Sequence, residues 1–180
     1  MNTKIKVSKI SSDVLIKEIT YILSAVLMMA ALSRITIPLQ PIPVTGQTLG
    51  VLLTGILLGR KRAFATMVTY IAMGVIGFPV FAHGAFGLAT LIGPTGGYLL
   101  GFIPAAYIMG YFADKGWYAK PLSAIVGIVL GTTMIFGFGI IWLANFTGWD
   151  IVINAGLIPF LPGALFKGLI VLGAIPILRK

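Results

Sequence analysis

Long apolar runs separated by short groups of basic residues limit most strongly how this chain can fold. Six runs, at about residues 19–33, 49–59, 63–77, 97–113, 122–144 and 157–178, contain a single charged residue, Lys167. Only 9% of the 180 residues are charged and 58% are hydrophobic, whereas soluble domains average about a quarter charged residues. A soluble globule of this composition could not cover its surface, so we expect an all-α membrane protein of six transmembrane helices.

The distribution of lysine and arginine predicts the orientation of these helices. Residues 1–17, the loops at 60–62 and 114–120 and the C-terminus hold nearly all of the basic residues, and the alternate connections hold only Arg34. Basic loops stay in the cytoplasm, so we expect both termini there, with residues 1–17 as a cytoplasmic segment of a single membrane domain spanning residues 1–180. A net charge of +9 could suggest a nucleic-acid partner, but the basic residues lie in short groups beside apolar runs. This placement fits membrane orientation better than a surface that binds phosphates, so we expect no nucleic-acid partner.

Two irregular segments of low charge lie on the opposite side of the predicted membrane. Residues 78–101 read FPVFAHGAFGLATLIGPTGGYLLG and carry no charge, and residues 35–48 read ITIPLQPIPVTGQT, with three prolines that disfavour a helix. Irregular backbone at membrane depth occurs only where it is buried in protein or lines a cavity. We therefore expect extracytoplasmic loops that fold over a ligand pocket.

Lys167 is the most informative single residue, because it lies near the middle of the sixth run. A lysine at that depth costs about 2.5–3.5 kcal/mol on insertion scales. The lysine could extend to an interface, lose its charge, bind carbonyl groups, or bind an anionic or carbonyl-bearing ligand. Gly163, one turn earlier beside a proline, could open the helix and expose backbone groups to the same pocket. No carboxylate lies within a run to pair with the lysine; the four acidic residues are Asp13, Glu18, Asp114 and Asp150.

Four further polar side chains are candidates for ligand contacts. Thr45 and Gln47 precede the second run, where Thr45 could either cap the helix or bind a ligand, and a buried Gln47 amide needs partners. Tyr98 follows a glycine turn, where it could form an aromatic pocket wall or lie at the membrane interface. His83, the one histidine, is either a simple loop residue or a ligand contact.

The motifs of several functional classes are missing from the sequence. It contains no GxxxxGK[ST] motif for ATP, no GxSxG or HExxH motif, and no cysteine. We therefore expect no enzymatic activity, no metal site and no cofactor on this chain. The absence of carboxylates within the runs also disfavours an ion-coupled carrier.

Three strings in order carry a family resemblance: PIPVTGQTLGVLLTGILLG at 41–59, GFPVFAHGAFGLATLIGPTGGYLLGF at 77–102, and PFLPGALFKG at 159–168. They closely resemble the BioY family, the biotin-binding S components of energy-coupling factor (ECF) transporters. The resemblance implies a multi-pass protein of the prokaryotic plasma membrane that captures biotin outside and delivers it inward. Its implied partners are a transmembrane coupling subunit and two ATPase subunits, which use the ATP.

The resemblance also implies a set of substrate-binding residues. Thr45 and Gln47 would lie near the ligand, and the loop containing Phe86 and Gly87 would form the other side with Tyr98. Lys167, with Gly163 before it, matches the lysine of the family's PGDxxK pattern. The sequence departs from this pattern at Ala164, where the family has aspartate.

Two features of the resemblance leave alternatives open. The loss of the aspartate at position 164 removes a hydrogen-bond acceptor for a ureido group or a partner for the lysine, so the ligand could be a different vitamin. The small-residue face of the first helix, through which S components bind the coupling subunit, retains Ala25, Ala30 and Ala31 without a strict AxxxA spacing. A solitary carrier of a small anionic metabolite and a membrane-embedded acyl or prenyl transferase are the rival interpretations.

Overall fold

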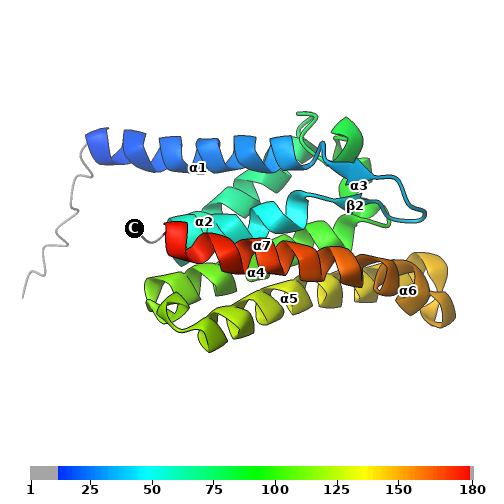
Figure 1. The fold of residues 1–180 in the computed structure, drawn as a ribbon. Helices are drawn as coiled ribbons and strands as arrows, with labels where there is room; N and C mark the ends of the chain where they lie inside the picture. Colours follow the sequence, from blue (N-terminus) through cyan, green and yellow to red (C-terminus); the bar gives the residue numbers. More distant parts are fainter. Residues whose placement is uncertain (1–11, 179–180) are drawn as a thin grey trace, which may run out of the picture.

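Helices make up most of the chain between residues 12 and 178, the part that the computed structural model describes (Figure 1). The five long helices are α1 (Ser12–Leu32), α2 (Gln47–Val75), α4 (Gly96–Asp114), α5 (Pro121–Thr147) and α7 (Leu161–Leu178). Short helices connect them: η1 (Ala82–Gly84), α3 (Leu88–Ile92), η2 (Trp117–Ala119), α6 (Trp149–Gly156) and η3 (Ile158–Phe160). The proline-rich segment after α1 contains an antiparallel strand pair, β1 (Thr36–Ile37) and β2 (Val44–Thr45).

The chain reverses direction within α2, at Gly59. This residue has φ 71° and ψ 171°, a backbone conformation that glycine adopts at little cost. Gln47 Nε2 donates a hydrogen bond to the Tyr70 hydroxyl over 2.6 Å, although 23 positions along one straight helix would separate two residues by about 35 Å. Residues 47–58 and 60–75 are therefore two antiparallel halves, and the break lies beside the basic residues where the sequence predicts a loop.

Four helical stretches are long and apolar enough to cross a membrane: Ser12–Leu32, Gly96–Asp114, Pro121–Thr147 and Trp149–Leu178. The two halves of α2 are about 18 and 24 Å long, less than the roughly 30 Å of a hydrocarbon core. Apolar side chains also cover the outer surface of the long helices, with Leu27 on α1 and Leu165 on α7 each 68% exposed. This outward apolar surface fits a lipid environment.

Close helix contacts at glycine hold α4 in the centre of the bundle. A Cβ atom built on Gly110 would lie 2.3 Å from the backbone nitrogen of Arg60, and one on Gly97 would lie 2.2 Å from Trp142 Cβ. Only glycine allows backbones to approach this closely, as is common between membrane helices. The sequence of α4 thus fixes its position against α2 and α5.

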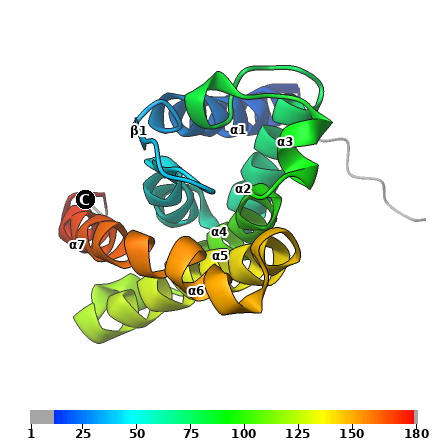
Figure 2. The ribbon, with the colours of Figure 1, turned by 90° about the vertical axis from the view of Figure 1, so that its right-hand side faces the viewer.

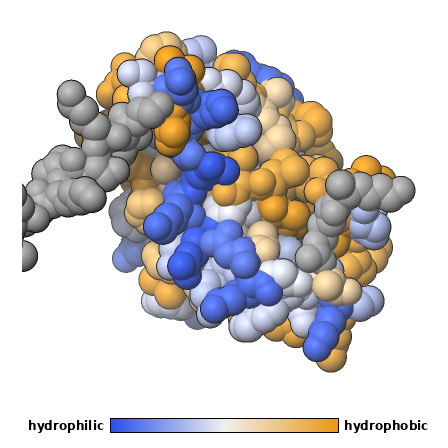
Figure 3. Space-filling view, turned by 90° about the vertical axis from the view of Figure 1, so that its left-hand side faces the viewer, coloured by the Kyte–Doolittle hydropathy of each residue, from blue (hydrophilic) through white to orange (hydrophobic). Residues whose placement is uncertain are grey.

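Charged side chains gather at one end of the bundle, which Figure 3 shows facing the viewer. Arg62 donates from Nε to Glu18 Oε2 over 2.7 Å and binds the second carboxylate oxygen through Nη2. Arg60 pairs with Asp114 over 3.4 Å. These contacts join the first half of α1, the Gly59 reversal and the end of α4 on one side. The predicted cytoplasmic side also includes the basic residues at 4, 6, 9, 179 and 180, which lie outside the described residues.

Candidate functional site

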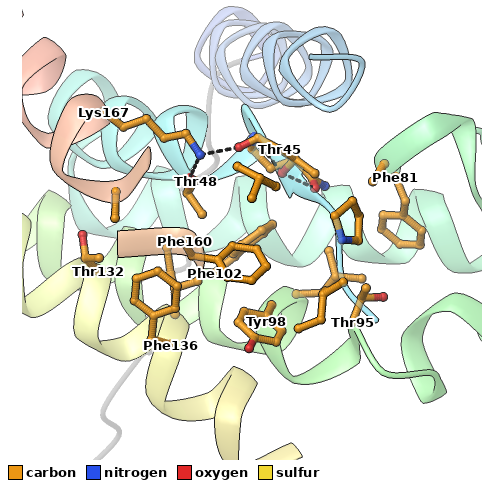
Figure 4. Close-up of a pocket in the computed structure, with 18 of the residues that line it drawn as sticks. Thr45, Thr48, Phe81, Thr95, Tyr98, Phe102, Thr132, Phe136, Phe160 and Lys167 are labelled. Carbon is orange, nitrogen blue, oxygen red and sulfur yellow. Dashed lines mark hydrogen bonds between the residues drawn. The ribbon is translucent and has the colours of Figure 1, made fainter. Parts of the chain in front are cut away.

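A cavity of about 290 Å³ lies at the opposite end, between the strand pair, the 81–85 segment, α4, α5 and α7 (Figure 4). Apolar side chains form most of its wall: Ile42, Pro43, Val44, Leu52, Phe81, Ala82, Ala85, Leu99, Phe102, Ile135, Phe136, Phe160 and Ala164. Its polar lining residues are Thr45, Gln47, Thr48, His83, Thr90, Thr95, Tyr98, Thr132 and Lys167. Among the described residues, no carboxylate lines this cavity.

Aromatic rings form one wall of the cavity. Phe160 stacks on Tyr98 with ring centroids 6.2 Å apart, and it meets Phe136 at 67° with centroids 6.3 Å apart. Figure 4 shows Phe102 beside these three rings. The rings come from α4, α5 and η3, so helix packing fixes their spacing. Such a wall suits a flat or fused-ring ligand.

Lys167 reaches the cavity from α7 and already has partners there. Its Nζ atom donates to the backbone carbonyl of Thr45 and, over 2.8 Å, to the hydroxyl of Thr48. An ammonium group has three N–H donors, so two protein contacts leave one for a ligand. The sequence left four roles open for Lys167, and the structure shows one of them: the lysine binds a carbonyl group, together with a hydroxyl group, inside the bundle.

A chain of hydrogen bonds continues from Thr45 into the protein core. The hydroxyl of Thr45 donates to Gln47 Oε1 over 2.9 Å and accepts the backbone N–H of Gln47 over 3.2 Å, so this residue orients both the first residue of α2 and its side-chain amide. Gln47 Nε2 donates to Tyr70, whose hydroxyl donates to the carbonyl of Val80 over 2.7 Å. Tyr70 is fully buried. The chain links the two segments that bound the cavity, around residues 45 and 81.

Of the seven predicted substrate-binding residues, four line this cavity: Thr45, Gln47, Tyr98 and Lys167. The hydroxyl of Tyr98 donates to the carbonyl of Gly156 over 2.8 Å, so its ring, not its polar atom, is the free surface. Their contact with a ligand stays a prediction.

The other three predicted residues lie outside the cavity lining. Phe86 is 58% exposed, and a Cβ built on Gly87 would have no neighbour within 4 Å. A Cβ on Gly163 would meet only Val44, at 3.7 Å, so this residue lies beside β2. The glycine-rich segment turns Phe86 and Gly87 outward and presents Phe81, Ala82 and Ala85 to the cavity instead.

Three aromatic lining residues had no distinguishing sequence signal. Phe102, Phe136 and Phe160 are apolar residues in apolar runs, and their spacing does not separate a cavity-facing ring from a lipid-facing one. Thr132, which lines the cavity, and Tyr70, which lies behind it, did carry a signal, because each places a hydroxyl within an apolar run. Within residues 12–178, no group of three or more histidine, aspartate or glutamate side chains could hold a metal ion.

The sequence of the chain is similar to those of known proteins. Residues 1–180 match the family model described as "BioY family". The "Probable biotin transporter BioY" of Pyrococcus horikoshii is 33% identical over 151 residues, which cover 84% of this chain and 89% of that protein. The "Biotin transporter BioY" of Thermotoga maritima is 38% identical over 139 residues, covering 74% and 78% of the two chains.

Similarity also extends to a solved structure. The crystal structure of "the S-component for biotin from an ECF-type ABC transporter" superposes with a TM-score of 0.83 at 25% sequence identity. The match covers 96% of this chain and 95% of that one.

Proposed function

Since the chain belongs to the BioY family, we propose that it is the biotin-capturing subunit of an ECF-type vitamin importer. The family resemblance predicted from the three sequence motifs is confirmed by the match over the whole chain. BioY family proteins are transporter S components, which confirms the expectation that the chain is not an enzyme.

The observation that carries the proposal is the position of Lys167 in the cavity. Its ammonium group lies in an aromatic-walled space that, in the described part of the chain, has no acidic lining residue to neutralise it. Such a site favours a ligand with an apolar body and an anionic or carbonyl group. Biotin has fused rings, a ureido carbonyl and a carboxylate. Thr45, Gln47 and Tyr98 would complete the contacts, with ring packing against Tyr98.

The proposal includes a topology of six spans with both termini in the cytoplasm and a single membrane domain. The Gly59 reversal supports six spans, because it divides α2 into two antiparallel halves. The pairing of Arg62 with Glu18 and of Arg60 with Asp114 supports one charged, cytoplasmic side in a prokaryotic plasma membrane. The strand pair and the 81–85 segment would then close the cavity on the extracytoplasmic side.

An energy source must come from partner subunits in this proposal. The sequence has no nucleotide-binding motif, so ATP would be used by two ATPase subunits joined through a transmembrane coupling subunit. Of the small residues predicted to contact the coupling subunit, Ala25 is buried, Ala30 is partly buried and Ala31 is exposed. Ala31 is therefore the member of the set that would be available to a partner.

Equilibrium binding of biotin to the purified chain in nanodiscs tests the proposal. Replacing Lys167 with methionine keeps the side-chain length and removes one charge-assisted hydrogen bond to the ligand, worth about 1.5–3 kcal/mol. We therefore expect Kd to rise about 10- to 150-fold. The matched control is Lys120→Met, an exposed lysine at the charged end, for which we expect no change.

The outcomes separate the competing interpretations. Saturable binding that Lys167→Met weakens supports biotin as the ligand, and binding only by Ala164→Asp would mean that the missing carboxylate has disabled the site. Binding by neither form would exclude biotin and lead to tests of other vitamins. Uptake by vesicles that contain this chain alone would instead indicate a solitary carrier.

A further inference from the structure

A second apolar cavity of about 700 Å³ runs along the outside of the bundle between α5 and α7, which lie side by side in Figures 1 and 2. We call it the α5–α7 groove. Its residues on α5 are Ile125, Ile128, Val129, Thr132, Thr133, Phe136, Gly137 and Ile140. Those from Leu157 onward are Leu157, Leu161, Ala164, Leu165, Gly168, Leu169 and Leu172.

Neither water nor empty space is a favourable filling for the α5–α7 groove. Thr132 and Thr133 are its polar lining residues, and every other lining residue is apolar or glycine. A buried water needs two to four polar partners, which this lining does not offer along its length. An empty space of this size would forfeit the dispersion contacts that dense packing normally supplies. The groove therefore requires an apolar occupant.

We propose that one acyl chain of a membrane phospholipid occupies the α5–α7 groove. Both α5 and the stretch Trp149–Leu178, which contains α7, are long and apolar enough to cross a membrane, so the groove faces the hydrocarbon core. From Leu161 to Leu172 it extends about 16 Å along the helix axis, the direction in which acyl chains lie. Leu165, 68% exposed, and Leu169, 58% exposed, form its rim on α7.

The occupied groove would also complete the wall of the ligand cavity. Thr132, Phe136 and Ala164 line both spaces. At position 164 the side chain shared by both linings is only a methyl group, since alanine is the residue present there. The acyl chain would thus pack on the outer side of the wall whose inner side faces the ligand. This site is independent of which ligand the cavity binds.

Gly137 offers a way to fill the groove without touching the ligand cavity. It lines only the groove, and a Cβ built on it would meet no atom within 4 Å. Gly137→Leu therefore introduces an apolar side chain into space that the acyl chain would use. Gly173→Leu is the matched control: this glycine lies on α7, has no neighbour within 4 Å of a built Cβ, and lies outside the groove.

Native mass spectrometry of the purified chain, titrated with palmitoyl-oleoyl phosphatidylcholine in detergent, tests the proposal. We expect wild type and Gly173→Leu to retain one phospholipid at a collision energy that removes all others, and Gly137→Leu to retain it at least 5-fold less often. Equal retention by all three forms would overturn the proposal. So would a second copy of the chain, or detergent alone, bound in place of the lipid.

A second variant guards against a folding defect. Val129→Phe fills the groove from another position on α5, and it is measured in the same way if Gly137→Leu elutes as an aggregate. Phospholipid retention by Val129→Phe at the wild-type level would overturn the proposal equally.

Discussion

Replacing Tyr70 with phenylalanine removes one hydroxyl from the hydrogen-bond chain behind the cavity. Gln47 Nε2 loses the acceptor at 2.6 Å and the Val80 carbonyl loses the donor at 2.7 Å. A buried group left without its partner costs about 1–3 kcal/mol, although hydrogen bonds between membrane helices average nearer 0.6 kcal/mol. We therefore expect Tyr70→Phe to lower the free energy of unfolding by about 1–3 kcal/mol in total.

The same change should weaken ligand binding, although Tyr70 does not line the cavity. A freed Gln47 side chain must be ordered again when the ligand binds, at a cost of about 0.5–1.5 kcal/mol. This corresponds to a Kd about 2- to 13-fold higher. The assay is biotin titration by calorimetry in nanodiscs, with thermal unfolding measured on the same samples.

A double-mutant cycle separates a positioning role from general destabilisation. If Tyr70 acts through the amide of Gln47, then Tyr70→Phe should change Kd by less than 2-fold in a Gln47→Leu background. Equal Kd values for wild type and Tyr70→Phe would refute the reasoning. An unchanged effect of Tyr70→Phe in the Gln47→Leu background would refute it as well, because the hydroxyl would then act by another route.

Two further changes test the packing and the charged end. Gly97→Ala should lower the free energy of unfolding by about 1–3 kcal/mol, because its Cβ would lie 2.2 Å from Trp142; the control Gly137→Ala should be neutral or stabilising, and equal thermal midpoints would contradict this. Glu18→Gln removes the partner of Arg62, so the midpoint should fall in low salt and the difference should shrink in high salt. A salt-independent difference would contradict the ion-pair explanation.

The candidate-site residues that the sequence could identify were polar residues that interrupt or adjoin an apolar run. Lys167 interrupts an apolar run, and Gln47 adds an amide next to one, so burial of either demands partners. The structure places both at the cavity. The basic residues at 60–62 indicated a loop in the same way, and the chain reverses at Gly59.

Residues that follow a pattern could not be assigned from sequence. An apolar helix in a membrane has apolar residues on every side, so Phe136 of the cavity wall and Phe138 on the exposed surface look alike in the sequence. The glycine content around Phe86 and Gly87 indicated a loop but not its direction. That direction depends on long-range contacts, such as the bond from Gly87 N–H to the Gly74 carbonyl over 2.7 Å.

The bonds from Lys167 to Thr45 and Thr48 have a consequence for the energetics of ligand capture. A cation inside a membrane protein is tolerated when it pairs with an opposite charge or with backbone carbonyls. Here a backbone carbonyl and a hydroxyl of the protein itself solvate the ammonium group. Ligand capture then replaces or extends an existing set of bonds, and a large part of each new contact is offset by the old one. If the proposed function holds, the same bonds would also ease release of the ligand, because Thr45 and Thr48 would remain available as partners for the lysine.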